Sequence, residues 1–170
     1  MILNTERLIL KRPNTLDINS YMIIRNSDEY YLFNPLPKLT HNEATHFLIN
    51  AIKNNGIIGI YLDQKMIGVI DIFPDQLRYG VNSVSISYAL NTAYTGHGYM
   101  HEALSALVFH YKKEKRYDII TARVYQSNIK SHRLLEKIGF VKEGILKHAV
   151  KGNFDMIHDD YLYAFYIGDI

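Results

Sequence analysis

Small, mostly polar residues and large apolar residues alternate without exception over residues 83–90 of this 170-residue chain. Every second residue from Val84 to Leu90 is large and apolar, whereas the residues between them are small. This period of two predicts a strand with one buried face. Beyond Gly98 the apolar residues recur with the period of a helix, which predicts a helix over 98–114. A strand and a helix therefore follow each other across a short glycine-rich segment.

The remaining elements follow from capping residues and turn formers. Thr40 followed by Glu43 forms a capping-box pattern, which predicts the start of a helix. Turn residues around 63–65 and 74–82 separate apolar runs with strand character. The predicted strands cover 7–12, 57–62, 66–73, 83–90, 119–125, 140–146 and 158–166, and the predicted helices cover 16–24, 40–54, 98–114 and 128–138.

This order of elements predicts one α+β domain that spans residues 1–170. The expected fold has three layers, in which a mixed, largely antiparallel sheet of about seven strands carries helices on both faces. One parallel crossover is expected, from strand 83–90 through helix 98–114 to strand 119–125. The crossover places the glycine-rich segment at the carboxyl end of a strand, where sheet folds commonly bind ligands.

The composition is typical of a globular protein and excludes several classes of partner and chemistry. Apolar residues make up 48% of the chain and charged residues 21%. The net charge of +2 is too small to indicate a nucleic-acid partner. The chain has no cysteine, which excludes disulfides and thiolate chemistry from its own side chains. Because no apolar run has the length of a membrane span and no signal-peptide core is present, we expect a cytoplasmic location without a membrane partner.

The glycine-rich segment Gly96-His97-Gly98 has the chemistry of an anion site. Glycine lets the backbone approach a ligand closely, and the first N–H groups of the following helix have no partner within the helix. Together with the helix dipole, these groups favour a phosphate. Taken alone, this segment could also be a structural loop that binds no ligand. A second motif is therefore needed to decide between a phosphate site and a structural loop.

Residues 96–103, with the sequence Gly-His-Gly-Tyr-Met-His-Glu-Ala, resemble the Gly-x-Gly-Tyr-x-x-Glu-Ala acetyl-CoA motif of the GNAT superfamily of N-acetyltransferases. Residues 128–144 are similar to the Asn-x-x-Ser…Leu-Glu-Lys-x-Gly-Phe…Glu-Gly signature of the RimJ/RimL-type branch. Segments 5–10 and 152–155, with Asp159, also match this branch, so the resemblance covers nearly the whole chain. Several motifs in the correct order are far more specific than one glycine turn.

The resemblance implies a GNAT-like fold with acetyl-CoA as the acyl donor and no metal. Backbone amides of the glycine turn would bind the pyrophosphate, and the end of strand 83–90 would pair with the pantetheine like an added strand. Arg133 and Lys130 would meet the 3′-phosphate. The residues expected to contact the coenzyme are Tyr88, Ala89, Leu90, Thr95, Gly96, His97, Gly98, Tyr99, Met100, His101, Asn128 and Arg133.

The same resemblance implies direct attack of an amine on the thioester in a ternary complex. Ser131 occupies the position at which RimL-like enzymes are proposed to protonate or hydrogen-bond the departing thiolate, and Asn128 belongs to the same motif. Where many relatives carry a strand glutamate, this chain offers Ser85 and Ser87, which favours deprotonation through water. An α-amine has a pKa of about 8 against about 10.4 for a lysine amine, so an α-amine acceptor is expected. The candidate residues on the acceptor side are Glu29, Tyr30 and Phe33.

The acceptor is expected to be a protein N-terminal α-amine, as on a ribosomal protein. Acetylation of a small-molecule amine or antibiotic, and a non-catalytic acyl-CoA-binding regulatory module, remain the alternatives. The acidic segment 155–160 lacks a ligand spacing typical of zinc, and a turn before a strand explains it. The sequence leaves open whether the protein is a monomer or a homodimer.

Overall fold

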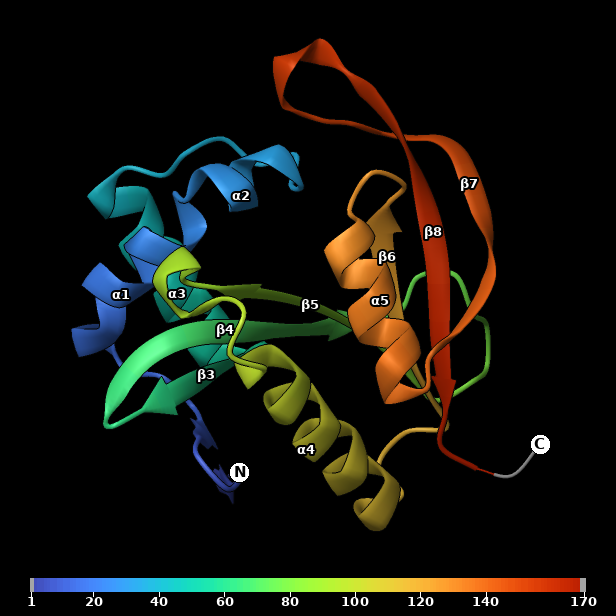
Figure 1. The fold of residues 1–170 in the computed structure, drawn as a ribbon, viewed down its shortest axis with the longest axis horizontal. Coiled ribbons are helices and arrows are strands. Elements are labelled where there is room, and N and C mark those ends of the chain that lie inside the picture. The colour runs from blue at the N-terminus through green and yellow to red at the C-terminus, as the bar shows by residue number, and fades with distance from the viewer. Residues whose placement is uncertain (1, 169–170) are drawn as a thin grey trace.

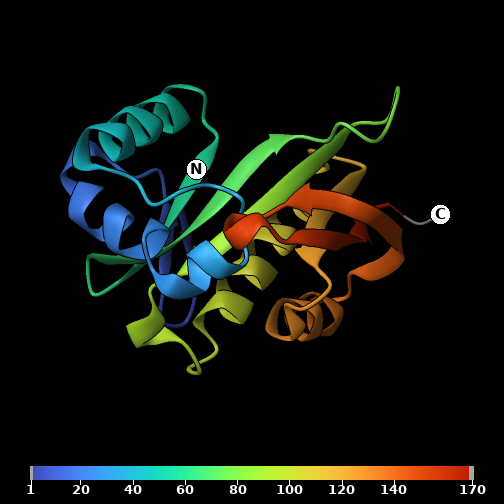
Figure 2. The same ribbon diagram turned by 90° about the horizontal axis from the view of Figure 1, so that it is seen from above.

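A computed structural model describes residues 2–168 and shows an eight-stranded sheet flanked by helices (Figures 1 and 2). The strands pair antiparallel except for β5 and β6, which are parallel. In spatial order the strands are β1 (Ile2–Asn4), β2 (Ile9–Lys11), β3 (Ile57–Leu62), β4 (Lys65–Pro74), β5 (Ser83–Leu90), β6 (Ile119–Tyr125), β8 (Ile157–Tyr166) and β7 (Val141–Lys151).

The helices begin and end at the residues that their capping chemistry favours. Thr40 and Glu43 form the expected capping box at the start of α3. Gly98 and Gly139, both with left-handed backbones, lie at the start of α4 and the end of α5. The helices are α1 (Ile18–Arg25), α2 (Asp28–Leu32), α3 (His41–Lys53), α4 (Tyr99–Glu114) and α5 (Ile129–Ile138), with 3₁₀ turns η1 (Thr15–Asp17), η2 (Thr92–Tyr94) and η3 (Asn153–Asp155).

Helices cover both faces of the sheet, as the sequence predicts. One buried cluster joins α4 and α5 to the sheet and includes Leu104, Leu107 and Leu135, all fully buried. A second cluster joins α1 and α3 to β3 and β4 and includes Ile24 and Leu48. Figure 1 shows α1 to α3 on one side of the molecule and α4 beneath the centre of the sheet. Burial of these apolar faces is the main force that holds the layers together.

Two strands differ from the sequence-based expectation. The predicted strand 7–12 is confined to β2, because the chain before it turns at Thr5, whose amide donates to the Leu8 carbonyl, and then forms the additional short strand β1. The last hairpin is longer than expected, since β7 continues to Lys151 instead of ending at 146. Register shifts interrupt β7, and His148 has a left-handed backbone, so this strand lacks regular alternation.

The sheet opens between its two parallel strands. Pairing of β5 with β6 begins at Ser83 with Ile119 and stops at Ile86 with Ala122, although both strands continue beyond this point. The ends of the two strands then diverge (Figure 1). Helix α4 makes the crossover between them, as predicted. The glycine turn, the end of β5 and the start of α5 therefore surround one opening.

Candidate active site

The glycine turn has the geometry of an anion site. Gly96 and Gly98 have φ values of 82° and 80°, in the left-handed region that glycine adopts without strain. A Cβ atom at Gly96 would meet nothing within 4 Å, so the backbone there faces open space. Gly98 is the N-cap of α4, and the first amides of this helix have no partner within it. The turn thus presents N–H groups and the positive end of a helix dipole to a ligand.

An ion pair from the N-terminal segment braces this turn. Arg7 donates from Nε to Glu102 Oε2 at 2.7 Å and from Nη1 to the His97 carbonyl at 3.0 Å. The Thr5 hydroxyl donates to the other oxygen of Glu102 at 2.5 Å. The guanidinium of Arg7 also lies 4.7 Å from the centre of the Tyr99 ring. Segment 5–10 and the glycine motif, which the sequence presents as separate signals, are therefore parts of one structure.

The end of β5 has one free edge. Residues Ser87 to Leu90 pair with β4 on one side, whereas their pairing with β6 has already ended. Backbone N–H and C=O groups along this edge are available to an extended ligand, as in peptide recognition by strand addition. The edge leads directly toward the glycine turn through η2. A long ligand that carries phosphates can therefore lie along β5 with its charged part at α4.

The two faces of β5 differ in chemistry. Val84 and Ile86 are buried in the core that includes α4, and Tyr88 packs against that core from the same face. On the other face the Ser85 hydroxyl lies 2.6 Å from the Thr121 hydroxyl, and Ser87 donates to Asp71 Oδ2 at 3.1 Å. We call this second face the polar floor; it is formed by Asp71, Ser85, Ser87, Thr121, Arg123, Tyr125 and Asp160.

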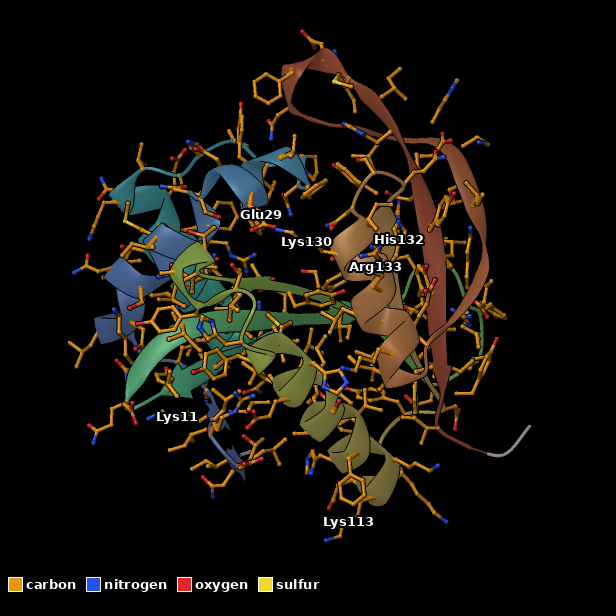
Figure 3. All side chains as sticks on the ribbon, in the orientation of Figure 1. Lys11, Glu29, Lys113, Lys130, His132 and Arg133 are labelled. Carbon is orange, nitrogen blue, oxygen red and sulfur yellow. The ribbon has the colours of Figure 1, made fainter. Side chains whose placement is uncertain are left out.

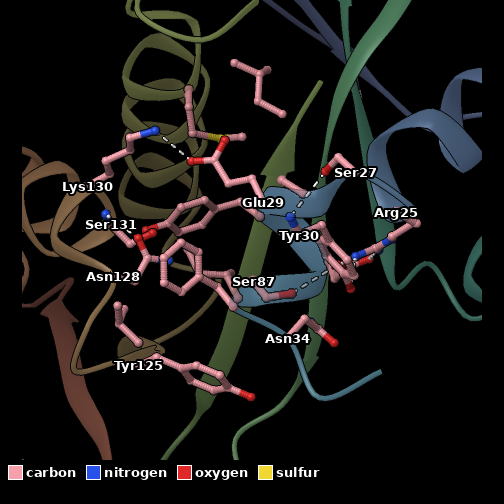
Figure 4. A pocket seen from close by; sticks show the side chains of 18 of the residues that line it. Arg25, Ser27, Glu29, Tyr30, Asn34, Ser87, Tyr125, Asn128, Lys130 and Ser131 are labelled. Carbon is pink, nitrogen blue, oxygen red and sulfur yellow. Dashed lines mark hydrogen bonds and ion pairs between the residues drawn. The ribbon is translucent and has the colours of Figure 1, made fainter. Parts of the chain in front are cut away.

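A cleft of about 840 Å³ lies over the opening in the sheet and collects most of the residues predicted from the sequence. Figure 4 shows side chains from α2, β5 and the start of α5 around this cleft. His97 and Arg133 are exposed and do not line it, and Arg133 lies further along α5 than Lys130 (Figure 3). The predicted residues that line the cleft are Glu29, Tyr30, Phe33, Ser85, Ser87, Tyr88, Ala89, Leu90, Thr95, Gly96, Gly98, Tyr99, Met100, His101, Asn128 and Ser131.

Ser131 lies in the first turn of α5, on the wall of the cleft next to Tyr88. The Asn128 side chain accepts a hydrogen bond from the Ser131 amide at 3.2 Å and caps the helix, which fixes the position of the serine. Burial raises the pKa of Tyr88 to about 12, an effect that the nearby Ser131 hydroxyl partly offsets. The Tyr88 hydroxyl forms no regular hydrogen bond within residues 2–168. Two hydroxyl groups therefore meet where the free edge of β5 passes α5.

The sequence reasoning missed a buried ion pair at the cleft between Asp71 and Arg25. One terminal nitrogen of Arg25 lies 2.5 and 2.6 Å from the two oxygens of Asp71, and another donates to the Tyr30 hydroxyl at 2.7 Å. Burial would lower the pKa of Arg25, but the charge of Asp71 and contact with Tyr30 keep it above its ordinary value. One feature of the sequence could have indicated this ion pair: Asp71 is a lone carboxylate within the apolar run that forms β4.

Two contacts join the segments that border the cleft. Lys130 at the start of α5 forms an ion pair with Glu29 of α2 at 2.8 Å (Figure 3). The Asn153 amide, at the tip of the β7–β8 hairpin, donates to the carbonyls of Tyr31 and Asn34 at 2.8 Å each. Helix α2 is therefore held both to α5 and to the hairpin. Of the residues in these contacts, Glu29, Asn34 and Lys130 line the cleft.

Comparison with known proteins identifies the family. Residues 7–141 match the family described as the Acetyltransferase (GNAT) domain. The chain is 31% identical over 155 residues to the Bacillus subtilis protein named "Probable N-acetyltransferase YjcK", covering 87% of this chain and 80% of that protein. The chain belongs to the GNAT acetyltransferase family. It is an acetyl-CoA-dependent N-acetyltransferase.

Solved structures of GNAT proteins share this fold. A GNAT-family acetyltransferase from Bacillus anthracis superposes with a TM-score of 0.89 at 22% identity, covering 99% of this chain and all of that one. RimL, described as a ribosomal L7/L12 alpha-N-protein acetyltransferase in complex with coenzyme A, gives 0.83 at 21% identity and covers 98% of both chains. The GNAT fold predicted from the sequence is thus confirmed, with eight strands instead of about seven. The RimJ/RimL-type resemblance agrees with a 34% identity over 107 residues to the Escherichia coli protein named "Ribosomal-protein-serine acetyltransferase", covering 62% of this chain and 57% of that protein.

Two further observations concern metals and membranes. Among the described residues, no group of three or more His, Cys, Asp or Glu side chains is arranged to hold a metal ion. Asp159 instead binds Lys147 and the His148 amide, and Asp155 pairs with Lys151, so most of the acidic segment is used within the hairpin. None of the helices in residues 2–168 has the length and apolar character needed to cross a membrane.

Proposed function

We propose that this acetyltransferase modifies an N-terminal α-amine of a protein, by direct attack of the amine on acetyl-CoA in a ternary complex. The observation that carries the proposal is the free edge at the end of β5. One face of this strand is on the side of the glycine turn, which suits the coenzyme, and the opposite face carries the polar floor. A donor and an acceptor can approach the same strand from its two faces. The likeness to RimL, named as an alpha-N-protein acetyltransferase, supports this acceptor class.

The proposed roles follow from position. Amides from Gly96 to Met100 bind the pyrophosphate, and the backbone of Tyr88 to Leu90 pairs with the pantetheine. An N–H group near Leu90 stabilises the oxyanion that forms at the attacked carbonyl. The Ser131 hydroxyl donates a hydrogen bond to the departing thiolate. Each of these groups is held by secondary structure, so little reorganisation is needed during the reaction.

Deprotonation of the acceptor is assigned to water on the polar floor. An α-amine with a pKa of about 8 is partly neutral near pH 7, whereas a lysine amine at about 10.4 is not. The Ser87 hydroxyl donates to Asp71, so its free lone pairs can accept a hydrogen bond from a water next to the amine. Asp71, which is paired with Arg25, accepts the hydrogen bond from Ser87 and so orients this hydroxyl. Water thus carries the proton away, with Ser85 and Ser87 lining its path.

A thiol-release assay tests the proposal. Acetyl-CoA is supplied with short peptides that carry a free α-amine, with the same peptides blocked at the N-terminus but containing lysine, and with polyamines and aminoglycosides. We expect release with the free α-amine peptides and little with the blocked ones. Efficient turnover of only polyamines, aminoglycosides or lysine side chains would reject the α-amine acceptor. Coenzyme binding without any amine-dependent release would indicate the non-catalytic module instead.

A further inference from the structure

Asp160 is a buried carboxylate on the polar floor that the roles above do not use. It lies on β8 directly opposite Tyr125 of β6, and only 2% of its surface is exposed. Both residues line the cleft. Because cross-strand partners project from the same face of a sheet, Asp160 and Tyr125 face the same side as Ser87 and Arg123. The carboxylate therefore lies on the acceptor side of the sheet.

Asp160 has one oxygen in use and one free. Arg123 donates to Oδ2 from Nε at 2.8 Å, and its terminal nitrogen lies 2.7 Å from the same oxygen. Oδ1 is buried and has no hydrogen-bond partner within residues 2–168, and the same holds for the Tyr125 hydroxyl. Asp71, the other carboxylate of the floor, contrasts with this arrangement because Arg25 contacts both of its oxygens and Ser87 contacts one.

A carboxylate oxygen that is buried without a donor is costly, and proteins rarely keep one without a function. The strongest partner for it is a cationic donor such as an ammonium or guanidinium group. The adjacent Tyr125 ring is stacked on His158 with 4.5 Å between ring centres, which fixes the direction of its hydroxyl. Because Tyr125 is directly opposite Asp160 in the register of β6 with β8, its hydroxyl is a second oxygen acceptor on the same face of the sheet. The pair forms a site for one positively charged group.

We propose that Asp160 and Tyr125 bind a cationic side chain of the acceptor, distinct from the amine that is acetylated. This inference rests on the proposed function, which places the reacting amine at the edge of β5. Strand β6 lies between β5 and β8, so Asp160 is at least two strand spacings, about 10 Å, from that edge. One or two extended residues span about 3.5–7 Å, and the long side chain of a lysine or arginine covers the rest of this distance. The preferred acceptors are therefore peptides with lysine or arginine shortly after the N-terminal residue.

The test uses tetrapeptide amides that begin with alanine and carry lysine at position 2, 3 or 4. Matched peptides carry glutamine or norleucine at the same position. We expect kcat/KM at one position to be about tenfold or more higher for lysine than for glutamine, mainly through KM. In Asp160→Asn the ratio of kcat/KM for the lysine peptide to kcat/KM for the glutamine peptide should fall close to one. Tyr125→Phe should lower this ratio to an intermediate value, and this second variant keeps the test valid if Asp160→Asn folds poorly.

Asp155→Asn is the matched control, because Asp155 belongs to the same hairpin but is 88% exposed and paired with Lys151. It should keep the lysine preference. Equal kcat/KM for lysine and glutamine peptides with the unmodified enzyme would overturn the inference. So would an equal loss for both peptides in Asp160→Asn and in Tyr125→Phe, since this would place the pair at the reacting amine or in the fold.

Failure of the proposed function gives a different result. If no tetrapeptide is acetylated, binding of the same peptides to the coenzyme-loaded protein is measured by calorimetry. A preference for lysine over glutamine that Asp160→Asn removes would still support the cation site, although the α-amine assignment would fail. No difference between the peptides in that measurement would overturn the cation site as well.

Discussion

Arg7 and Glu102 are 95 positions apart in the chain, yet they form an ion pair of 2.7 Å at the start of α4. The same Glu102 carboxylate accepts from the Arg7 amide at 2.9 Å, so the backbone as well as the side chain of the N-terminal segment is fixed to the helix. Arg7 in turn holds the His97 carbonyl. The shape of the glycine turn thus depends on a residue outside it.

The first prediction concerns this brace. Arg7→Ala removes the contacts to Glu102 and to His97, so the turn should fluctuate more and bind acetyl-CoA about three- to tenfold more weakly, since the contact is charged but partly exposed. Isothermal titration measures the change. Lys113→Ala, at the exposed far end of the same helix, is the control and should leave the affinity unaltered. An affinity unaffected by Arg7→Ala would show that the turn holds its shape without the brace.

The second prediction concerns pH. Burial alone would raise the pKa of Glu102, but hydrogen bonds from Thr5 and Arg7 and the Arg7 charge lower it below its ordinary value of 4.5. A lowered pKa in the folded state stabilises the fold above the unfolded pKa, and this stabilisation is lost as the pH falls through the folded value. The melting temperature of the unmodified protein should therefore fall more steeply below about pH 4.5 than that of Glu102→Gln. Parallel melting curves between pH 7 and pH 3 would contradict this.

The third prediction concerns the left-handed glycine. Gly98→Ala forces a side chain onto a φ of 80° and should cost about 1–2 kcal/mol of stability. Coenzyme affinity should fall as well, because the first amides of α4 shift. Gly144→Ala in β7 is the control, since a Cβ there meets nothing within 4 Å and its φ is outside the left-handed region. Denaturant unfolding of both variants gives the comparison, and equal losses would argue against backbone strain at Gly98.

The fourth prediction concerns Asp71 and Arg25. Asp71→Asn leaves the buried guanidinium without its anion and should cost about 3–5 kcal/mol of stability, measured by denaturant unfolding. The double change Asp71→Leu with Arg25→Met removes both charges and should recover much of this loss. Stability of the double variant below that of Asp71→Asn would show that the pair contributes more than mutual neutralisation.

The fifth prediction concerns Ser131. Ser131→Ala should lower kcat by about a hundredfold while KM for acetyl-CoA changes little, because the hydroxyl acts on charge that develops at the sulfur. Steady-state kinetics with a free α-amine peptide measures this. An unchanged kcat would remove Ser131 from the reaction and direct attention to the neighbouring Tyr88 hydroxyl, whose buried position beside the serine would then be tested by Tyr88→Phe.

The elements proposed to bind the coenzyme could be predicted from the sequence, because each of them is marked by a local sequence pattern. The period of two in β5, the glycines before α4 and the Asn128 cap each depend on neighbours in the chain. The ion pair between Asp71 and Arg25 could not be predicted from the sequence, since it depends on how α1 packs against β4. Asp160 was seen only as part of an acidic turn, because the register of β8 with β6 is what places it opposite Tyr125.

Strand β1 was also missed for a physical reason. It has three residues, which is too short to show a hydrophobic period, and its pairing with β2 maintains it. The irregular register of β7 likewise hides its alternation beyond Leu146. The opening between β5 and β6 leaves no mark in either strand, because both keep a regular pattern where their pairing has ended.

The two hydrogen bonds of the Asn153 amide join the tip of the hairpin to α2 and to Asn34, so the border of the cleft is continuous at this point. A continuous border admits the free tip of a polypeptide, which can be threaded inward, more readily than a stretch that continues in both directions. A lysine within a folded domain belongs to a stretch that continues in both directions. Under the proposed function, the geometry of this passage would favour chain ends before any chemical discrimination between amines takes place.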